Sequence, residues 1–200
     1  MASTGTESNR REIASAACDL VAAGGLDSVS MRKIAQHLGS TTGYISHYYV
    51  DKEDLLEAAL LAALSDLTTH LGSPSESLEE WIDNAAESLP RSEETQRFWR
   101  VLTAFQAASM NSERLSAVLR NYVADNEAAL ARHLTPVVPR DAAASDVSAL
   151  ARSLFALVAG LGTTSTINTG VFTAEQQRAV VRAAVQGLVD EFAERQGGGQ

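Results

Sequence analysis

The chain is poor in cysteine, proline and aromatic residues. Its 200 residues include one cysteine, four prolines and 6% aromatics, while apolar residues make up 45%. A single cysteine excludes an intramolecular disulfide, and we expect Cys18 to be a packed, unreactive thiol at the edge of a helix face. Long β-branched runs are absent and alanine and leucine are abundant, which favours an all-helical protein.

Long apolar runs and the pattern of a secretory leader are also missing. No uninterrupted apolar run reaches the roughly 18 residues that a bilayer-spanning helix needs. The N-terminal segment MASTGTESNRRE is polar and lacks the apolar core of a signal peptide. We therefore expect a soluble cytoplasmic protein that does not associate with membranes.

The sequence lacks the signatures of an enzyme. His37, His70 and His133 are too scattered for metal-ligand spacing, and there is no phosphate-binding loop or nucleophile elbow. Serine and aspartate are plentiful, but nothing connects them to a catalytic histidine. We therefore expect no catalytic site, no bound metal and no cofactor, because a helical enzyme would need a buried polar constellation that this pattern does not provide.

Positive charge is scarce and unevenly distributed, and the formal net charge at pH 7 is −9. Residues 1–52 contain five basic and five acidic side chains, so their net charge is zero. Residues 53–200 contain 11 basic and 20 acidic side chains and carry the whole excess. Phosphate would repel the second part and not the first, so the chain can approach nucleic acid only with its N-terminal part.

Helical periodicity is nearly continuous and is broken by short segments that contain glycine or proline. We predict helices at about residues 9–23, 31–38, 42–49, 52–71, 76–89, 93–110, 112–134, 142–161 and 174–195. Several residues are of the types that cap helix starts: Ser30, Ser40 or Thr41, Asp51, and Thr173 with Gln176. Residues 1–8 and 196–200 are expected to be loose tails.

Residues 30–52, SMRKIAQHLGSTTGYISHYYVDK, combine two short predicted helices with a tight turn at Gly39. Ile34 and Ala35 face inward on the first helix, and the small Ala35 lets the second helix cross closely. Ile45 follows the turn at the right distance to fill the space between the two helices. This pattern is typical of a helix-turn-helix, in which the second helix enters the DNA major groove.

The outward side chains of the second helix suit contact with DNA. Hydroxyl, phenol and imidazole groups can reach base edges or phosphate from Thr41, Thr42, Tyr44 and His47. The alternative for His47 is a surface or capping histidine. Gly43 costs about 1 kcal/mol relative to alanine inside a helix, which indicates either a need for close backbone approach to DNA or poor local stability.

Other side chains of this segment suit phosphate. We expect Ser30 and the nearby free backbone N–H groups, together with Lys52, to bind phosphate. Arg32 points outward and suits a phosphate or a guanine. Of Tyr48 and Tyr49, one is expected to pack against the first or fourth helix, and we predict that Tyr48 is the one that contacts phosphate.

Residues 10–64 resemble the N-terminal domain of TetR-type regulators. The resemblance rests on Gly24-Gly25, Val29-Ser30, Ile34-Ala35, Leu38-Gly39, Gly43, Ile45, His47-Tyr48-Tyr49 and Lys52 followed by Leu55-Leu56. It implies that Thr42, Gly43, Tyr44 and His47 face bases, and that Ser30, Tyr48 and Lys52 face phosphates. The sequence departs from the family at Ser46, where tyrosine or phenylalanine is common, so a contact by a larger side chain is not expected there.

Large apolar side chains gather in the three central predicted helices. They are Trp81, Phe98, Trp99, Leu102, Phe105, Met110 and Tyr122. They predict either ordinary core packing or the lining of a ligand cavity, which in helical bundles lies between helices. Arg97 and Arg100 suit either an anionic ligand or solvent. Residues 97–134 resemble the subgroup that includes the choline-responsive repressor BetI, which implies a small-molecule effector of unspecified identity.

We therefore predict an all-α chain of about nine helices. A three-helix DNA-binding domain spans residues 1–52, and a helical bundle for ligand binding and dimerisation spans residues 53–200. We expect the last two helices to form a four-helix interface with a second copy, through the apolar stripes around Leu154 and Val185. Two recognition helices would then lie about 34–36 Å apart on a palindromic double-stranded operator.

The predicted function is a repressor that a small molecule releases from its operator. The alternative is a DNA-binding or architectural factor without a small ligand, controlled by a protein partner.

Overall fold

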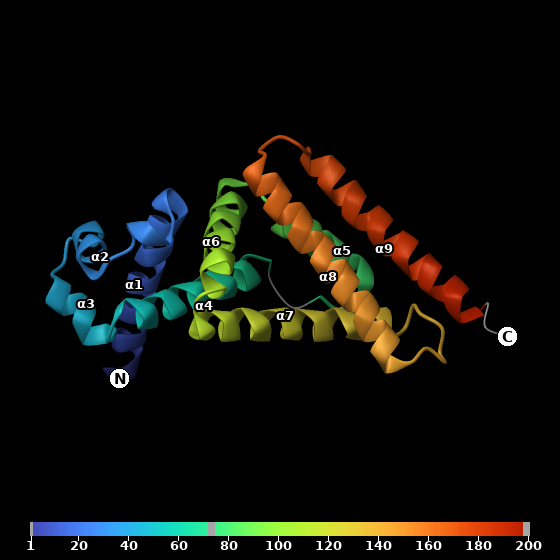
Figure 1. Cartoon of the computed structure of the whole chain (residues 1–200), viewed down its shortest axis with the longest axis horizontal. Coiled ribbons are helices and arrows are strands. Elements are labelled where there is room, and N and C mark those ends of the chain that lie inside the picture. Colours follow the sequence, from blue (N-terminus) through green and yellow to red (C-terminus); the bar gives the residue numbers. More distant parts are fainter. Residues whose placement is uncertain (1, 72–74, 198–200) are drawn as a thin grey trace. The chain divides into compact units, whose positions relative to one another are not determined.

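The fold is given by a computed structural model that describes the backbone of residues 2–71 and 75–197 and the side chains of residues 5–67 and 75–195 (Figure 1). The described elements are α1 (Ala2–Gly24), a 3-10 turn (Leu26–Ser28), α2 (Met31–His37), α3 (Thr42–Tyr48), α4 (Lys52–Leu71), α5 (Leu78–Ser88), α6 (Glu93–Ser109), α7 (Glu113–Leu134), α8 (Ala144–Ile167) and α9 (Ala174–Gly197). The described part of the chain contains no strand. The predicted all-α class is confirmed.

Three of the predicted boundaries differ from the structure. Residues 2–8 belong to α1 and are not a loose tail, since no proline or second glycine interrupts the helix there. α8 continues past residue 161 to Ile167 because Gly162 is buried within the helix and does not stop it. The predicted tail 196–200 lies partly in α9, which ends at Gly197. The predicted break at residues 72–74 lies outside the described residues.

Side-chain caps fix the starts of α2, α3, α4 and α9, as predicted. An oxygen of the capping side chain accepts a hydrogen bond from a backbone N–H that no helical carbonyl can reach. These bonds join Ser30 to Lys33 N at 3.2 Å, Thr41 to Tyr44 N at 3.2 Å, Asp51 to Asp54 N at 2.8 Å and Thr173 to Gln176 N at 3.2 Å. Thr41, and not Ser40, therefore begins α3.

Packing groups the helices into two units. One contains α1–α3, α4 up to His70, α6 from Arg97 and the start of α7 up to Arg120. The other contains α5, the first turn of α6, the rest of α7, α8 and α9. This division describes packing alone, and the functional boundary between residues 52 and 53 stays a prediction.

The core of the first unit joins α1 to the two short helices α2 and α3. Apolar side chains from all four of its N-terminal helices are buried there: Ile13, Ala17, Val21, Ile34, Ala35, Ile45, Leu55 and Ala59. Gly39 has a φ of 62°, a conformation that side chains with a Cβ avoid. This turn lets Ser40 N bond to Ala35 O at 2.8 Å, which closes α2 and redirects the chain into α3.

In the second unit, α9 packs against both α5 and α8. The apolar stripes that we expected to face a second copy are largely buried inside this unit, including Val147, Leu150, Leu154, Val181 and Val185. That part of the dimer prediction is wrong, because periodicity identifies an apolar face without showing what covers it. The exposed face of α8 carries mainly small side chains, whereas the exposed face of α9 is mainly charged and polar, with Ala179, Val180, Ala183 and Gly187 between the polar residues.

One helix is more apolar than the search for uninterrupted runs indicated. By length and composition, α8 could cross a membrane, with a mean hydropathy of 1.4 in its most apolar window. Helices in the core of a soluble domain have the same composition. Because α8 packs against α9 and 39% of that window is buried within the chain, this composition is weak evidence for a membrane span.

The core predicts a large cost for shortening Ile45. Its side chain is completely buried, so Ile45→Ala should lower the free energy of unfolding by about 2–5 kcal/mol. Urea unfolding followed by circular dichroism measures this change. The neighbouring Ser46 is exposed, and Ser46→Ala should change the free energy by less than about 0.5 kcal/mol. Equal effects of the two substitutions would contradict the packing described here.

Candidate nucleic-acid interface

The helix α3 has one buried side and one exposed side. Ile45 and Tyr49, which follows the helix, are 0% and 1% exposed and hold it to the first unit. Thr42, Gly43 and His47 are exposed on the other side. Within the first unit, α2 and α3 lie at the end away from α6 (Figure 1). The exposed face of α3 is therefore open to an external partner.

Three rings form an aromatic cluster on this face. The ring centroid of Tyr48 lies 5.1 Å from that of Tyr44 and 5.0 Å from that of His47, both edge to face. Partial desolvation and the neighbouring Tyr48 raise the pKa of Tyr44 above its usual value. One cause of this shift is a side-chain hydrogen bond with Tyr48, in which the protonated Tyr44 phenol is the donor. The structure thus brings together Tyr44 and His47, which the sequence pattern assigned to base edges, and Tyr48, which it assigned to phosphate.

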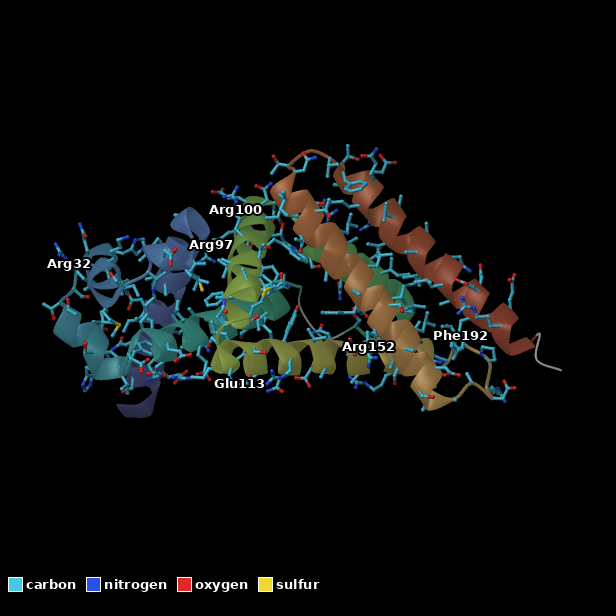
Figure 2. All side chains as sticks on the ribbon, viewed as in Figure 1. Arg32, Arg97, Arg100, Glu113, Arg152 and Phe192 are labelled. Carbon is cyan, nitrogen blue, oxygen red and sulfur yellow. The ribbon has the colours of Figure 1, made fainter. Side chains whose placement is uncertain are left out.

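The predicted phosphate-contacting residues are also accessible, although some already have partners. The Ser30 hydroxyl caps α2 and the Thr41 hydroxyl caps α3, each as an acceptor, so each keeps its own proton available for donation. Lys52 is exposed, and its Nζ donates to Leu26 O at 3.1 Å. Arg32 and Lys33 are exposed on α2, and Arg32 extends outward in Figure 2.

The two tyrosines at the end of α3 have different roles. The Tyr49 hydroxyl donates to Arg10 O at 2.7 Å, and the Arg10 guanidinium lies 4.4 Å above the Tyr49 ring. Burial raises the pKa of Tyr49. Tyr49 is thus the packed tyrosine, whereas Tyr48 is only half-buried. This assignment leaves Tyr48 as the tyrosine that can contact a ligand.

Two residues of α1 that the sequence analysis missed contact Tyr48. Asn9 Nδ2 donates to the Tyr48 hydroxyl at 2.8 Å, and the Arg10 guanidinium donates to the Tyr48 carbonyl. No local signal could have revealed them, because they precede the periodic apolar positions of α1 and lie 38 and 39 residues from Tyr48.

The candidate ligand-binding residues are divided between the two units. In the first unit, Phe98, Trp99, Leu102 and Phe105 are buried, and the rings of Phe98 and Trp99 meet edge to face at 5.9 Å. In the second unit, Trp81 and Tyr122 are half-buried. The ring centroid of Tyr122 lies 6.3 Å from that of Phe155, edge to face. Met110 is 84% exposed at the end of α6. A side chain this exposed does not line a cavity, so Met110 is not a candidate ligand contact.

The environment of Arg97 differs from both alternatives predicted for it. Its guanidinium binds Asp19 of α1, with Nε 2.9 Å from Oδ1, and also donates to Ser15 O at 3.4 Å. The other oxygen of Asp19 lies 3.6 Å from His37 Nε2 on α2. Arg97 is thus engaged within the protein, while Arg100 is exposed (Figure 2).

The thiol of Cys18 is packed as expected. It is 1% exposed and donates to Ala59 O at 3.1 Å. Burial raises the pKa of the thiol to about 12, so it stays protonated and unreactive at physiological pH. Among the residues that the structure describes, no three or more histidine, cysteine, aspartate or glutamate side chains form a group that could hold a metal ion.

This geometry defines the class of protein. A short exposed helix, held across a glycine turn by a second short helix and capped at its start, is the helix-turn-helix of DNA-binding proteins. Comparison with known proteins gives the family. Residues 13–59 match bacterial regulatory proteins of the tetR family, and residues 78–190 match the C-terminal domain of BetI-type transcriptional repressors. The chain therefore belongs to the TetR family of transcriptional regulators, which are not enzymes.

Individual relatives agree with this assignment. The chain is 30% identical over 145 residues to the HTH-type transcriptional regulator BetI 2 of Chromohalobacter salexigens, covering 68% of this chain and 67% of the relative. A transcriptional regulator from Rhodococcus sp. Rha1 has a similar fold, with a TM-score of 0.82, 19% identity and coverage of 91% and 96%. A protein from Saccharomonospora viridis, solved in complex with choline, has a TM-score of 0.71, 21% identity and coverage of 90% and 96%.

The exposed site of Gly43 gives a direct test of the interface. A Cβ added there would meet only Thr41 Oγ1, at 3.9 Å, so Gly43→Ala fits the free protein and should stabilise it by up to about 1 kcal/mol. If DNA approaches this backbone closely, the added methyl group should weaken binding by about tenfold, or about 1.4 kcal/mol. Fluorescence anisotropy with a duplex selected from a random pool by the wild-type protein measures the affinity. Unchanged affinity would contradict a close approach at Gly43.

Proposed function

We propose that the protein is a cytoplasmic repressor that binds a palindromic operator as a homodimer and releases it when a small molecule binds. The observation that carries this proposal is the division of α3 into a buried side, held by Ile45 and Tyr49, and an exposed side with polar and aromatic groups. A helix anchored in this way presents a rigid surface whose width suits a major groove.

The proposed contacts divide into two kinds. Thr42, Gly43, Tyr44 and His47 face base edges, where hydroxyl and imidazole groups distinguish base pairs. The groups that hold phosphate and set the register are Ser30, Arg32, Thr41, Tyr48 and Lys52. The zero net charge of residues 1–52, compared with −9 for the remainder, supports an approach by this part of the chain.

We propose that dimerisation uses the exposed faces of α8 and α9. Exposed residues at helical spacing are Ala156, Gly160 and Ile167 on α8. On α9, the exposed pair at this spacing is Val180 and Ala183. Small side chains allow two helices to approach closely, and a twofold axis through this face would pair each helix with its copy. The expected separation of the two recognition helices is about 34–36 Å, one turn of DNA.

Regulation is proposed to pass from α6 and α7 to the DNA-binding helices through polar contacts within the first unit. Arg97 of α6 binds Asp19 of α1. Arg114 of α7 donates to Glu57 of α4 at 2.8 Å, and Ser112 donates to Glu53 at 2.8 Å. A ligand that displaces α6 or the start of α7 would therefore shift α1 and α4, and with them the position of α3.

The proposed effector is a small molecule that contacts either Phe98, Trp99, Leu102 and Phe105 of the first unit or Trp81 and Tyr122 of the second. Choline is the first compound to test, because a protein of similar fold was solved with it and because aromatic faces attract quaternary ammonium groups. The alternative proposal is a DNA-binding or architectural factor controlled by a protein partner, whose operator binding no small molecule would change.

Removing two of the three rings of the aromatic cluster should strongly weaken operator binding while leaving the fold intact. Tyr44→Ala with His47→Ala removes two exposed or half-buried side chains, each of which is expected to contribute about 1–3 kcal/mol to base recognition. Affinity for the selected duplex should therefore fall at least about thirtyfold. Circular dichroism and sedimentation should show an unchanged fold and oligomeric state. Arg195→Ala, an exposed change on α9, serves as the control and should bind like the wild type.

If choline is an effector, choline should lower the affinity for the operator by the same factor as the operator lowers the affinity for choline. Binding of both ligands is linked by one coupling energy, typically about 1–3 kcal/mol, or about 5- to 150-fold in affinity. Titration calorimetry of choline with and without the selected duplex, and anisotropy of the duplex with and without choline, should give the same factor. Unequal factors would contradict a single coupled equilibrium, and a factor of one would exclude choline.

A further inference from the structure

Asn9 of α1 forms a hydrogen bond with the Tyr48 hydroxyl at the end of α3. Asn9 Nδ2 is the donor and the Tyr48 hydroxyl oxygen is the acceptor, at 2.8 Å. A phenol carries a single proton and accepts through its lone pairs. Because Asn9 is the donor, the proton of Tyr48 is not used in this bond. A side-chain hydrogen bond with Tyr48 raises the pKa of Tyr44, so Tyr44 is the donor in that contact and the Tyr48 proton remains available for a second partner.

Tyr48 is placed to use that proton on the exposed side of α3. Its side chain is half-buried, and its ring lies against Tyr44 and His47 at centroid distances of 5.1 and 5.0 Å. A phosphate oxygen can only accept a hydrogen bond, so a hydroxyl with a free proton suits it, whereas a hydroxyl that donates within the protein does not.

Asn9 itself is held in place by the neighbouring residue. Arg10 donates to the Tyr48 carbonyl, its guanidinium lies 4.4 Å from the Tyr49 ring centroid, and its carbonyl accepts from the Tyr49 hydroxyl at 2.7 Å. These three contacts join the start of α1 to the end of α3. The Asn9 amide therefore meets Tyr48 in a defined orientation.

We propose that Asn9 is a positioning residue for operator binding, which acts by directing the Tyr48 hydroxyl proton toward a DNA phosphate. This inference rests on the proposed function of α3 as the recognition helix. It assigns a role to α1, outside the helix-turn-helix itself, and it makes Asn9 and Tyr48 a single functional pair.

A double-mutant cycle tests the pair directly. The proteins are the wild type, Asn9→Ala, Tyr48→Phe and the double variant, and the probe is the duplex selected from a random pool by the wild type. We expect Asn9→Ala and Tyr48→Phe each to weaken binding about five- to tenfold, as the loss of one hydrogen bond of about 1 kcal/mol implies. In the Tyr48→Phe background, Asn9→Ala should change the affinity less than about twofold, because the two changes remove the same interaction.

Three outcomes would overturn the proposal. Equal effects of Asn9→Ala in both backgrounds would show that Asn9 contacts DNA by itself or acts through the fold. No effect of Asn9→Ala in the wild-type background would show that the bond does not matter for binding. A loss of affinity accompanied by a lower melting temperature in both backgrounds would indicate a structural role. Ser8→Ala, a neighbouring exposed position on α1, is the matched control and should leave affinity unchanged.

The same measurements separate this proposal from the proposed function. If the wild type selects a duplex and the Tyr44→Ala, His47→Ala variant fails to bind it, the recognition helix is supported whatever the cycle shows. An additive cycle would then overturn only the role of Asn9. If the wild type selects no duplex, the proposed function and the role of Asn9 both fail.

Discussion

A seven-residue helix is not stable by itself in water, and α3 depends on the burial of Ile45 and Tyr49 in the first unit. There α3 packs against α2, and Tyr49 contacts Arg10 of α1. Because Ile45 and Tyr49 supply the anchorage, the opposite side needs no apolar residue. It can then carry Thr42, Gly43 and His47, which contribute nothing to the core. Because its buried side anchors the helix and its exposed side carries the polar groups, α3 is rigid in the free protein and accessible to a partner.

The turn and the caps follow from the same constraint. A left-handed Gly39 ends α2 so that α3 can cross it closely, and the Thr41 hydroxyl accepts from Tyr44 N, one of the free N–H groups of the first turn of α3, without a tertiary contact. At the other end, Asn9 and Arg10 of α1 hold the tyrosines that follow. Farther along the first unit, Arg97 and Arg114 bind carboxylates on α1 and α4. The proposed regulation requires these contacts to move together with α3.

The sequence predicted the helix-turn-helix closely because its determinants lie within about twenty residues: Ser30, Gly39, Thr41 and Ile45 act through local geometry. It could not predict contacts such as Asn9 with Tyr48, or Arg97 with Asp19, because only the fold brings together residues 39 and 78 positions apart. The apolar stripes of α8 and α9 were recognised but assigned to the wrong partner, since a monomer core and a dimer interface have the same periodicity. The start of α1 was missed because its residues are polar.

The measurement that tests the central claim most directly is methylation interference on the selected operator. Dimethyl sulfate modifies guanine N7 in the major groove and adenine N3 in the minor groove. If α3 enters the major groove of two symmetric half-sites, N7 methylation should prevent binding at two positions centred about 10–10.5 base pairs apart. Interference from adenine N3 alone, or from a single unrepeated site, would contradict recognition by paired copies of α3.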